Sequence, residues 1–237
     1  GTYRVFAWPF GDPNDGDRTL TVDPADAISS PFGWHDTDGL MGAESSQTVG
    51  NNVDAYLDFT NDNNAAASDR ADGVGGVFDF AVDFTQSPTT YRPAAVANLF
   101  YWNNIIHDVL YRYGFTESAG NFQVNHYGRF EVPVGVNPGS GDPVRAEAQD
   151  AGGMNNANFS TGNDGSRPRM QMFLWVPQGG YQVQVQAGPA AGNYAATPAN
   201  YGAFLAEIFV TQPTAEVAGT SPANACEVPR NEPAPHA

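Results

Sequence analysis

The stretch PAAVANLFYWNNIIHDVLYRY, residues 93–113, carries the one strong helix pattern of this chain. Pro93 suits the first turn of a helix, and Gly114, directly after the stretch, suits its C-terminal stop. Between them apolar residues recur at helical spacing, namely Val96, Leu99, Phe100, Ile106, Val109, Leu110 and Tyr113. The stretch therefore predicts a helix of about six turns, long enough to cross a domain.

Strand and turn patterns surround this helix. Frequent glycine (26) and proline (18) favour many turns. Residues 51–76, rich in aspartate and asparagine, predict an acidic loop. Alternating or strand-like segments predict strands at 2–8 (TYRVFAW), 77–84 (VFDFAVDF), 121–128 (NFQVNHYG), 169–175 (RMQMFLW) and 181–187 (YQVQVQA). From residue 188 the composition shifts to Ala, Gly, Pro and Asn, which divides the chain into 1–187 and an extension at 188–237.

The charge balance excludes several classes of partner. Acidic residues number 26 against 10 basic ones, all of them arginine, for a net charge of -16. Such a surface repels phosphate backbones and anionic membranes, so we expect neither nucleic acid nor a membrane as a partner. No apolar run approaches the roughly 18 residues that a membrane helix needs. The single cysteine, Cys226, has no partner for an internal disulfide, and its pairing outside the chain stays open.

The four histidines of the sequence do not form a recognisable zinc motif. A helical zinc site needs two histidines four residues apart, and none of the histidines has that spacing: His35, His107, His126 and His236. His107, beside Asp108 in the predicted helix, is interpreted as a partly buried histidine that donates to a neighbour. A ligand or acid–base role is the alternative.

Calcium is a second candidate metal. It takes six to eight oxygen ligands, which aspartate and asparagine on glycine-containing loops provide. The acidic loop offers such aspartates, although the EF-hand spacing is absent: Asp54, Asp58, Asp62, Asp69 and Asp72. A solvated acidic loop without an ion is the alternative.

The segment GGMNNANFST, residues 152–161, predicts an unusual edge. Asparagine is depleted from strands, yet three occur here on one short extended segment. A carboxamide offers a donor and an acceptor, so Asn155 and Asn156 suit the clamping of a peptide bond, and small Ala157 would let a substrate backbone approach closely. An edge or turn protected by polar side chains is the alternative.

Several long stretches together resemble one family, the fungalysin metallopeptidases. GTYRVFAWPFGDP (1–13) is similar to the start of their mature chains, after propeptide removal. TTYRPAAVANLFYW (89–102) and NLFYWNNIIHDVLYRYGFTESAGNFQ (98–123) resemble their long helix and the strand after it. AQDAGGMNNANFSTGNDGSRPRMQMFLW (148–175) resembles their substrate-edge segment. The resemblance runs in order over roughly residues 1–175.

This resemblance implies a fold and a site. Fungalysins look like thermolysin-type zinc endopeptidases, in which an edge strand of the N-terminal domain binds peptide antiparallel beside the active-site cleft. Its Asn-Ala pair matches Asn156 and Ala157, with Asn155 before them. We therefore expect an α+β fold, mainly antiparallel strands with one long helix. Residues 1–187 would form the N-terminal catalytic subdomain, and 188–237 resembles the entry to a protease-associated insert.

One departure from the family limits what the chain does alone. The zinc motif, H-E-x-x-H with a downstream glutamate, is not in this sequence. The chain is therefore expected to supply the substrate edge of a secreted, extracellular enzyme, while a remaining half holds zinc. His107 and Asp108 would support the interface between the halves. Alone, the chain is predicted not to hydrolyse peptides, because a zinc peptidase needs ligands, a polarised water and a general base.

Two other readings stay open. One is a self-standing, non-catalytic fragment or module on the same scaffold, with a peptide-binding, calcium-binding or assembly role. The other, a carbohydrate-binding β module, depends only on four Trp and ten Tyr, which more often pack in cores.

Overall fold

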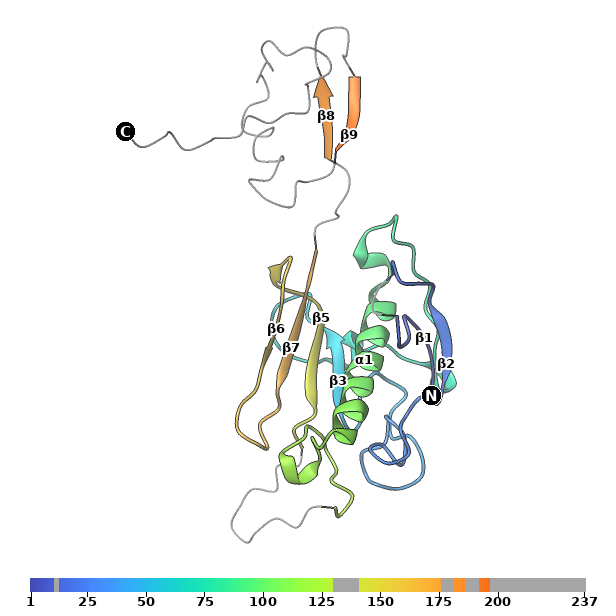
Figure 1. Cartoon of the computed structure of the whole chain (residues 1–237), viewed down its shortest axis with the longest axis vertical. Helices are drawn as coiled ribbons and strands as arrows, with labels where there is room; N and C mark the ends of the chain where they lie inside the picture. The colour runs from blue at the N-terminus through green and yellow to red at the C-terminus, as the bar shows by residue number, and fades with distance from the viewer. Residues whose placement is uncertain (11–12, 130–140, 176–180, 186–191, 197–237) are drawn as a thin grey trace, which may run out of the picture. The chain divides into compact units, whose positions relative to one another are not determined.

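The computed structural model describes residues 1–10, 13–129 and 141–175, and the backbone alone of 181–185 and 192–196 (Figure 1). The chain divides into two compact units, 1–175 and 176–237. In the second unit, β8 (Tyr181–Val185) and β9 (Gly192–Ala196) form an antiparallel pair. Cys226 and His236 lie outside the described residues, and the predicted division at residue 187 stays a prediction.

The first unit begins with a small sheet in the order β2-β1-β4. Strand β1 (Thr2–Val5) is antiparallel to β2 (Thr19–Val22) and parallel to β4 (Val77–Phe78). Tyr3 and Val5 alternate inward from β1 and are buried. His35, from the following loop, stacks between Phe78 and Phe100, with ring centroids 5.1 and 4.7 Å away. This aromatic cluster forms the centre of the hydrophobic core.

The second sheet positions the candidate site. It contains β3 (Val53–Leu57), β5 (Val144–Met154), β7 (Arg169–Leu174) and β6 (Ala157–Ser160), in that spatial order. The first three strands are parallel, and β6 pairs antiparallel with β7 at the open edge. Ala55, Ala146 and Ala148 face the hydrophobic core, so their neighbours Tyr56 and Glu147 lie on the other face of the sheet.

Helix α1 (Arg92–Arg112) confirms the prediction for 93–113, with each end shifted by one residue. Figure 1 shows it between the two sheets, and it packs on β1, β3 and β5. Val96 and Phe100 are fully buried in its N-terminal half. Short 3-10 turns η3 (Pro88–Thr90) and η4 (Glu117–Ala119) flank it, and two others, η1 (Ala67–Asp69) and η2 (Val74–Gly76), precede β4.

The C-terminal half of α1 reverses the usual pattern. The buried side chains there are polar: Asn103, Asn104, His107 and Asp108. Apolar residues of the predicted stripe are instead exposed, Ile106, Val109 and Leu110 by 42–45% and Tyr113 by 86%. The helix therefore presents an apolar outer surface, a pattern that needs an explanation.

The strand predictions are partly wrong. The sheets are mixed, not mainly antiparallel, because the connection between β3 and β5 contains α1 and such a crossover makes neighbouring strands parallel. The predicted loop 51–76 contains the buried strand β3, where Asp54 interrupts an apolar run and is neutralised by arginines. Only Val77–Phe78 of the predicted strand 77–84 pairs, and 121–128 contains no strand.

Candidate functional site

The asparagine segment lies at the open edge of the second sheet. Asn155, Asn156 and Ala157 are exposed, and all four residues of β6 are exposed. The Asn155 N–H donates to Leu174 O at 2.9 Å, with Asn155 in the left-handed region at φ 54°, which asparagine tolerates better than most residues. The structure therefore brings the three predicted residues together at the start of the edge strand.

Main-chain groups of this edge point in alternating directions. The Asn156 carbonyl accepts from Phe173 N–H at 3.3 Å and so faces β7. Because antiparallel ladders alternate, the main-chain groups of Ala157 and Phe159 face away from β7, toward the open edge. The Ala157 N–H is held by the Asn156 Oδ1 at 2.8 Å. The edge thus offers main-chain donors and acceptors and a carboxamide that already contacts one of them.

A group of buried carboxylates lies behind this edge. Asp58, Glu147 and Asp150 are exposed by 1%, 0% and 1%, and each has an oxygen within 4.8 Å of the others'. Asp58 accepts from Asp62 N–H at 2.9 Å and Asn63 N–H at 3.0 Å. We call Asp58, Glu147 and Asp150 the buried carboxylate group.

A β-bulge creates this group. Glu147 and Asp150 are three residues apart, so a regular strand would place them on opposite faces. Gln149 has φ 48°, and the register of β5 on β7 shifts between Ala148 and Asp150. The extra residue brings Asp150 to the face of Glu147. Sequence reasoning missed Glu147 and Asp150 because this face change has no simple sequence signal; the one hint is two carboxylates inside a buried strand.

The Glu147 carboxylate is incompletely satisfied. Oε1 accepts from Tyr56 OH at 2.7 Å, but the buried Oε2 has no hydrogen-bond partner among the described residues. Glu147 forms an ion pair with Arg169. The Arg169 Nε lies 3.9 Å from Glu147 Oε2 and has no hydrogen-bond partner of its own among the described residues. The pKa of Glu147 is raised to about 7, mainly by burial and in addition by nearby Asp150 and Asp58, while the hydrogen bond from Tyr56 acts in the opposite direction.

A polar row connects the group to the edge strand. In the register of the sheet, Tyr56 lies opposite Glu147, Glu147 opposite Gln171, and Gln171 opposite Asn158. The Gln171 Nε2 donates to Asp150 Oδ2 at 2.6 Å, and Asn158 Nδ2 donates to Gln171 Oε1 at 3.0 Å. The buried carboxylates are therefore hydrogen-bonded to β6 through a single side chain.

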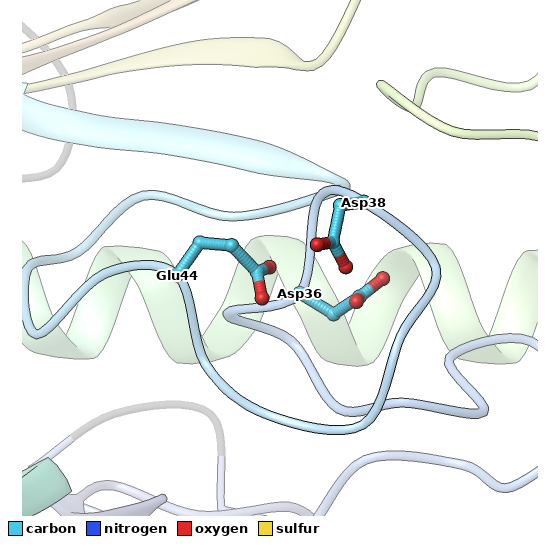
Figure 2. Close-up of side chains that lie close together, drawn as sticks. All are labelled: Asp36, Asp38 and Glu44. Carbon is cyan, nitrogen blue, oxygen red and sulfur yellow. The ribbon is translucent and has the colours of Figure 1, made fainter.

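A second acidic group, Asp36, Asp38 and Glu44, lies inside one loop (Figure 2). Asp36 is buried, whereas Asp38 and Glu44 are exposed. Tyr127 OH and Gly39 N–H donate to Asp36 at 3.0–3.3 Å, and Leu40 N–H donates to Asp38 at 2.8 Å. Burial raises the pKa of Asp36 despite these bonds. The group is a hydrogen-bonded acidic loop, and nothing further indicates a ligand there.

The predicted calcium aspartates do not form one site. Asp54 is paired with Arg70 at 2.7 Å and Arg167 at 3.0 Å. Asp62 accepts a hydrogen bond from Asn64 N–H, Asp69 from Ala66 N–H and Asp72 from Ser46 OH. Of the five, Asp58 alone belongs to a close carboxylate group in the described part of the chain.

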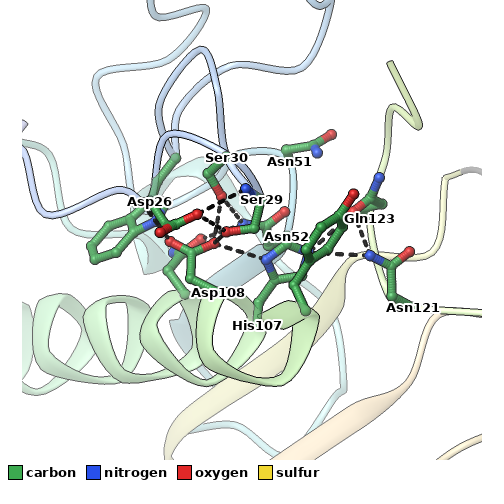
Figure 3. Close-up of polar contacts among 12 residues, drawn as sticks. Asp26, Ser29, Ser30, Asn51, Asn52, His107, Asp108, Asn121 and Gln123 are labelled. Carbon is green, nitrogen blue, oxygen red and sulfur yellow. Dashed lines mark hydrogen bonds and ion pairs between the residues drawn. The ribbon is translucent and has the colours of Figure 1, made fainter. Parts of the chain in front are cut away.

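Asp108 anchors α1 to the N-terminal loop (Figure 3). It accepts five hydrogen bonds, at 2.7–3.0 Å, from Asp26 N–H, Ser29 OH, Ser30 OH, Trp34 Nε1–H and His107 Nδ1–H. Burial raises its pKa, but the bonds from His107 and the other donors outweigh burial and lower it overall. His107 is buried, and its Nε2 lies 3.1 Å from Gln123 Oε1. This agrees with the interpretation of His107 as a buried histidine bonded to a neighbour.

The described residues do not fit zinc. Zinc peptidases bind the ion through imidazoles and carboxylates together. Within residues 1–10, 13–129 and 141–175, the groups close enough to share an ion contain carboxylates only. His35 contacts Tyr3 OH and Val49 O, and His107 contacts Asp108 and Gln123. No zinc chemistry is therefore assigned to this chain's own side chains.

Comparison with known proteins identifies the family. A sequence model of the fungalysin metallopeptidase (M36) family matches residues 2–216. The chain belongs to the fungalysin family. It is 37% identical over 177 residues to the extracellular metalloproteinase MEP of Leptosphaeria maculans, covering 74% of this chain and 26% of that protein. It is 38% identical over 176 residues to extracellular metalloproteinase 5 of Trichophyton tonsurans, covering 74% and 27%.

A third relative matches a similar share of this chain. The chain is 39% identical over 177 residues to the probable extracellular metalloproteinase 2 of Arthroderma benhamiae, covering 73% of this chain and 26% of that protein. The chain thus spans about a quarter of the length of the curated relatives it matches. In the part of the chain that the structure describes, no helix is long and apolar enough to cross a membrane.

Proposed function

We propose that this chain is the substrate-edge half of a secreted zinc metalloendopeptidase, which hydrolyses peptides only with a zinc-binding half. The observation that carries the proposal is the exposed edge strand β6 at the segment that resembles the family's substrate edge. Membership of the fungalysin family supports it. The chain also spans about a quarter of the length of each relative, which is compatible with an H-E-x-x-H motif in another part of the proposed enzyme.

A peptide would add to the sheet as a further strand beside β6. The outward main-chain groups of Ala157 and Phe159 would pair with its backbone, which is the usual source of affinity in strand addition. Asn156 would exchange its contact with Ala157 N–H for a contact with a substrate peptide group. Asn155 would fix the turn into the strand through its bond to Leu174 O. Alanine at 157 leaves room for the substrate backbone.

The remaining half of the enzyme would cover the exposed apolar face of α1. Ile106, Val109, Leu110 and Tyr113 follow the i, i+3, i+4, i+7 spacing of one helix face, and each is exposed by more than 40%. Such a surface favours a protein partner. The whole would be a thermolysin-like arrangement in which Asp108 and His107 hold this helix to the N-terminal loop. Zinc, held by the other half, would activate water and polarise the scissile carbonyl.

The setting of the proposed enzyme is extracellular. The relatives are named extracellular metalloproteinases, and the net charge of -16 suits solubility and disfavours nucleic acid and anionic membranes as partners. Its partners would be peptide or protein substrates and the zinc-binding half.

A chimera tests the proposal. The matching segment of the Leptosphaeria maculans metalloproteinase is replaced by this chain's residues, and hydrolysis of a fluorogenic peptide is measured with and without a chelator. We expect chelator-sensitive hydrolysis by the chimera and none by the chain alone. Asn156→Ala should lower kcat/KM about tenfold, the equivalent of one hydrogen bond of about 1.4 kcal/mol.

The control is Asn64→Ala, which removes an exposed asparagine outside the edge strand and should leave kcat/KM unchanged. Hydrolysis by the lone chain would contradict the division of labour. Equal kcat/KM for the two variants, in chimeras that bind zinc equally, would contradict the role of the edge.

A self-standing, non-catalytic module is the second candidate, supported by the absence of a zinc motif from the chain. The intact mass of the native protein separates the two. A species near 25.2 kDa without zinc would favour the module, and a much larger species with one zinc would favour the peptidase.

A further inference from the structure

We propose that Asp58, Glu147 and Asp150 bind a calcium ion, which fixes the β5 bulge and, through Gln171, the edge strand β6. The proposal concerns a site other than zinc and does not depend on the proposed function. It rests on three observations: the closeness and burial of the carboxylates, an oxygen without a partner, and the charge of the surroundings.

The geometry suits calcium. Calcium–oxygen distances are about 2.3–2.6 Å, so two ligands of one ion lie at most about 5 Å apart. The three carboxylates offer oxygens within 4.8 Å of one another. A fourth oxygen lies nearby, because a Cβ at Gly152 would be 2.8 Å from both Asn61 Oδ1 and Asp150 Oδ1. Carboxylate and amide oxygens on two segments, with water completing the shell, match what calcium accepts.

The unpartnered oxygen indicates that something is bound. Glu147 is fully buried, and its Oε2 has no hydrogen-bond partner among the described residues. Buried polar atoms are almost always satisfied, by protein, water or an ion. The other carboxylates of the group have partners, Asp58 in two backbone N–H groups and Asp150 in Gly152 N–H and Gln171. Glu147 Oε2 is therefore the one carboxylate oxygen of the group that has no hydrogen-bond partner among the described residues.

The charge also favours a divalent ion. When all three are ionised, as calcium binding would require, the buried carboxylates carry a formal charge of −3, and Arg169, the cation paired with them, contributes +1. Its guanidinium is directed to Asn63 Oδ1 and makes no hydrogen bond to the group through Nε. The sum of −2 is the charge that one calcium ion would neutralise, and uncompensated buried charge is costly.

The exposed acidic group provides a contrast. Asp36, Asp38 and Glu44 lie equally close together, but two of them are exposed and each accepts a hydrogen bond. An exposed acidic cluster of this kind needs no ion. It therefore serves as the matched control for carboxylates in close proximity.

The test is calcium binding by the full 237-residue chain. The chain is stripped with a chelator, dialysed and titrated calorimetrically with calcium chloride, for the wild type and for Glu147→Gln, Asp150→Asn and Asp38→Asn. We expect one equivalent in the wild type and in Asp38→Asn, with at least a tenfold weaker affinity in Glu147→Gln and Asp150→Asn. No binding in the wild type, or a loss confined to Asp38→Asn, would overturn the proposal.

Thermal unfolding separates a lost ligand from a damaged fold. At about a hundred times Kd, calcium should raise the Tm of the wild type by roughly 5–10 °C and leave that of Glu147→Gln unchanged. In chelator, Glu147→Gln should be at least as stable as the wild type, because the substitution removes a buried negative charge that no calcium ion then compensates. A variant that is less stable than the wild type in chelator would show a merely structural glutamate and would overturn the proposal.

Hydrogen exchange tests the connection to the edge. Calcium should slow the exchange of amides in β6 and β7 of the wild type and have no such effect on Glu147→Gln. Amides of β1, in the other sheet, are the internal control and should not respond. Calcium binding without protection of β6 would refute the role assigned to Gln171.

Discussion

At the scale of single residues, His35 shows how burial changes chemistry without creating a site. Its ring is packed between two phenylalanines, with Nε2 2.7 Å from Tyr3 OH and Nδ1 3.1 Å from Val49 O. Burial lowers its pKa to about 4, although the Val49 carbonyl raises it. His35, whose spacing to the other histidines fits no zinc motif, is therefore a neutral member of the core at pH 7.

This gives a prediction for acid stability. In the unfolded chain His35 binds a proton near pH 6.5, whereas in the folded protein it does so only near pH 4. The unfolded state thus binds more protons between these values, so the contribution of His35 to stability is lost as the pH falls from about 6.5 to about 4. By pH 4.5 the loss should reach about 2–3 kcal/mol.

His35→Phe, which keeps a stacked ring, should reduce this pH dependence by that amount. The measurement is urea unfolding at pH 7 and pH 4.5 for both proteins, because other titrating groups cancel in the comparison. Parallel pH profiles would contradict the assignment.

At the scale of the element, α1 depends on one carboxylate as much as on its apolar contacts. Four of the five hydrogen bonds to Asp108 join the helix to the loop that contains Asp26, Ser29, Ser30 and Trp34, and the fifth comes from His107 of the same helix (Figure 3). Asp108→Asn would present amide hydrogens to these donors and leave buried groups unpaired. We expect a loss of about 3 kcal/mol or more in the free energy of unfolding.

Asp17→Asn, at an exposed position, is the control for this substitution and should change stability by less than about 0.5 kcal/mol. Urea unfolding at pH 7 provides both values. If Asp108→Asn changes the free energy of unfolding only slightly, the stability of the protein depends on the loop and not on the helix.

At the scale of the whole molecule, the outer face of α1 gives the next prediction. Val109→Glu places a charge on a side chain that is 42% exposed in the chain alone. It should therefore change the stability of the lone chain by less than about 0.5 kcal/mol. In the chimera, where the zinc-binding half would cover this face, it should lower folded yield and kcat/KM at least tenfold. Equal losses in both settings would contradict an interface.

The sequence predicted the helix and the position of the edge, but not how the sheets connect. The helix was predictable because Pro93 and Gly114 mark its ends. The parallel pairing of β3 with β5 was not, because Asp54 hides β3 inside an acidic segment and pairing partners 91 residues apart, such as Tyr56 and Glu147, leave no local trace. The burial of the other polar residues of α1 was missed for a related reason, since Asn103, Asn104 and Asp108 look like a solvated face in the sequence, and only His107 was predicted to be partly buried.

The residues of the candidate site were likewise predictable where they are neighbours in the sequence and not where they meet only in the fold. Asn155, Asn156 and Ala157 are contiguous, so composition alone pointed to them, and their role in binding stays a prediction. Asp58 was named with four aspartates that turned out to lie elsewhere, because proximity along the chain was the available guide. Glu147 and Asp150 were overlooked, since their meeting depends on the bulge at Gln149.

That bulge has a consequence for how the protein can vary. A single extra residue between Ala148 and Asp150 shifts the inward–outward alternation of β5, so Asp150 occupies the face that its neighbour would otherwise take. Removing one residue between Ala148 and Asp150 would turn Asp150 away from Glu147 and shift the approach to the edge strand, with no change in hydrophobicity or charge pattern elsewhere. The number of residues in this segment is therefore under tighter constraint than their identity, and deletions should be tolerated there less well than substitutions.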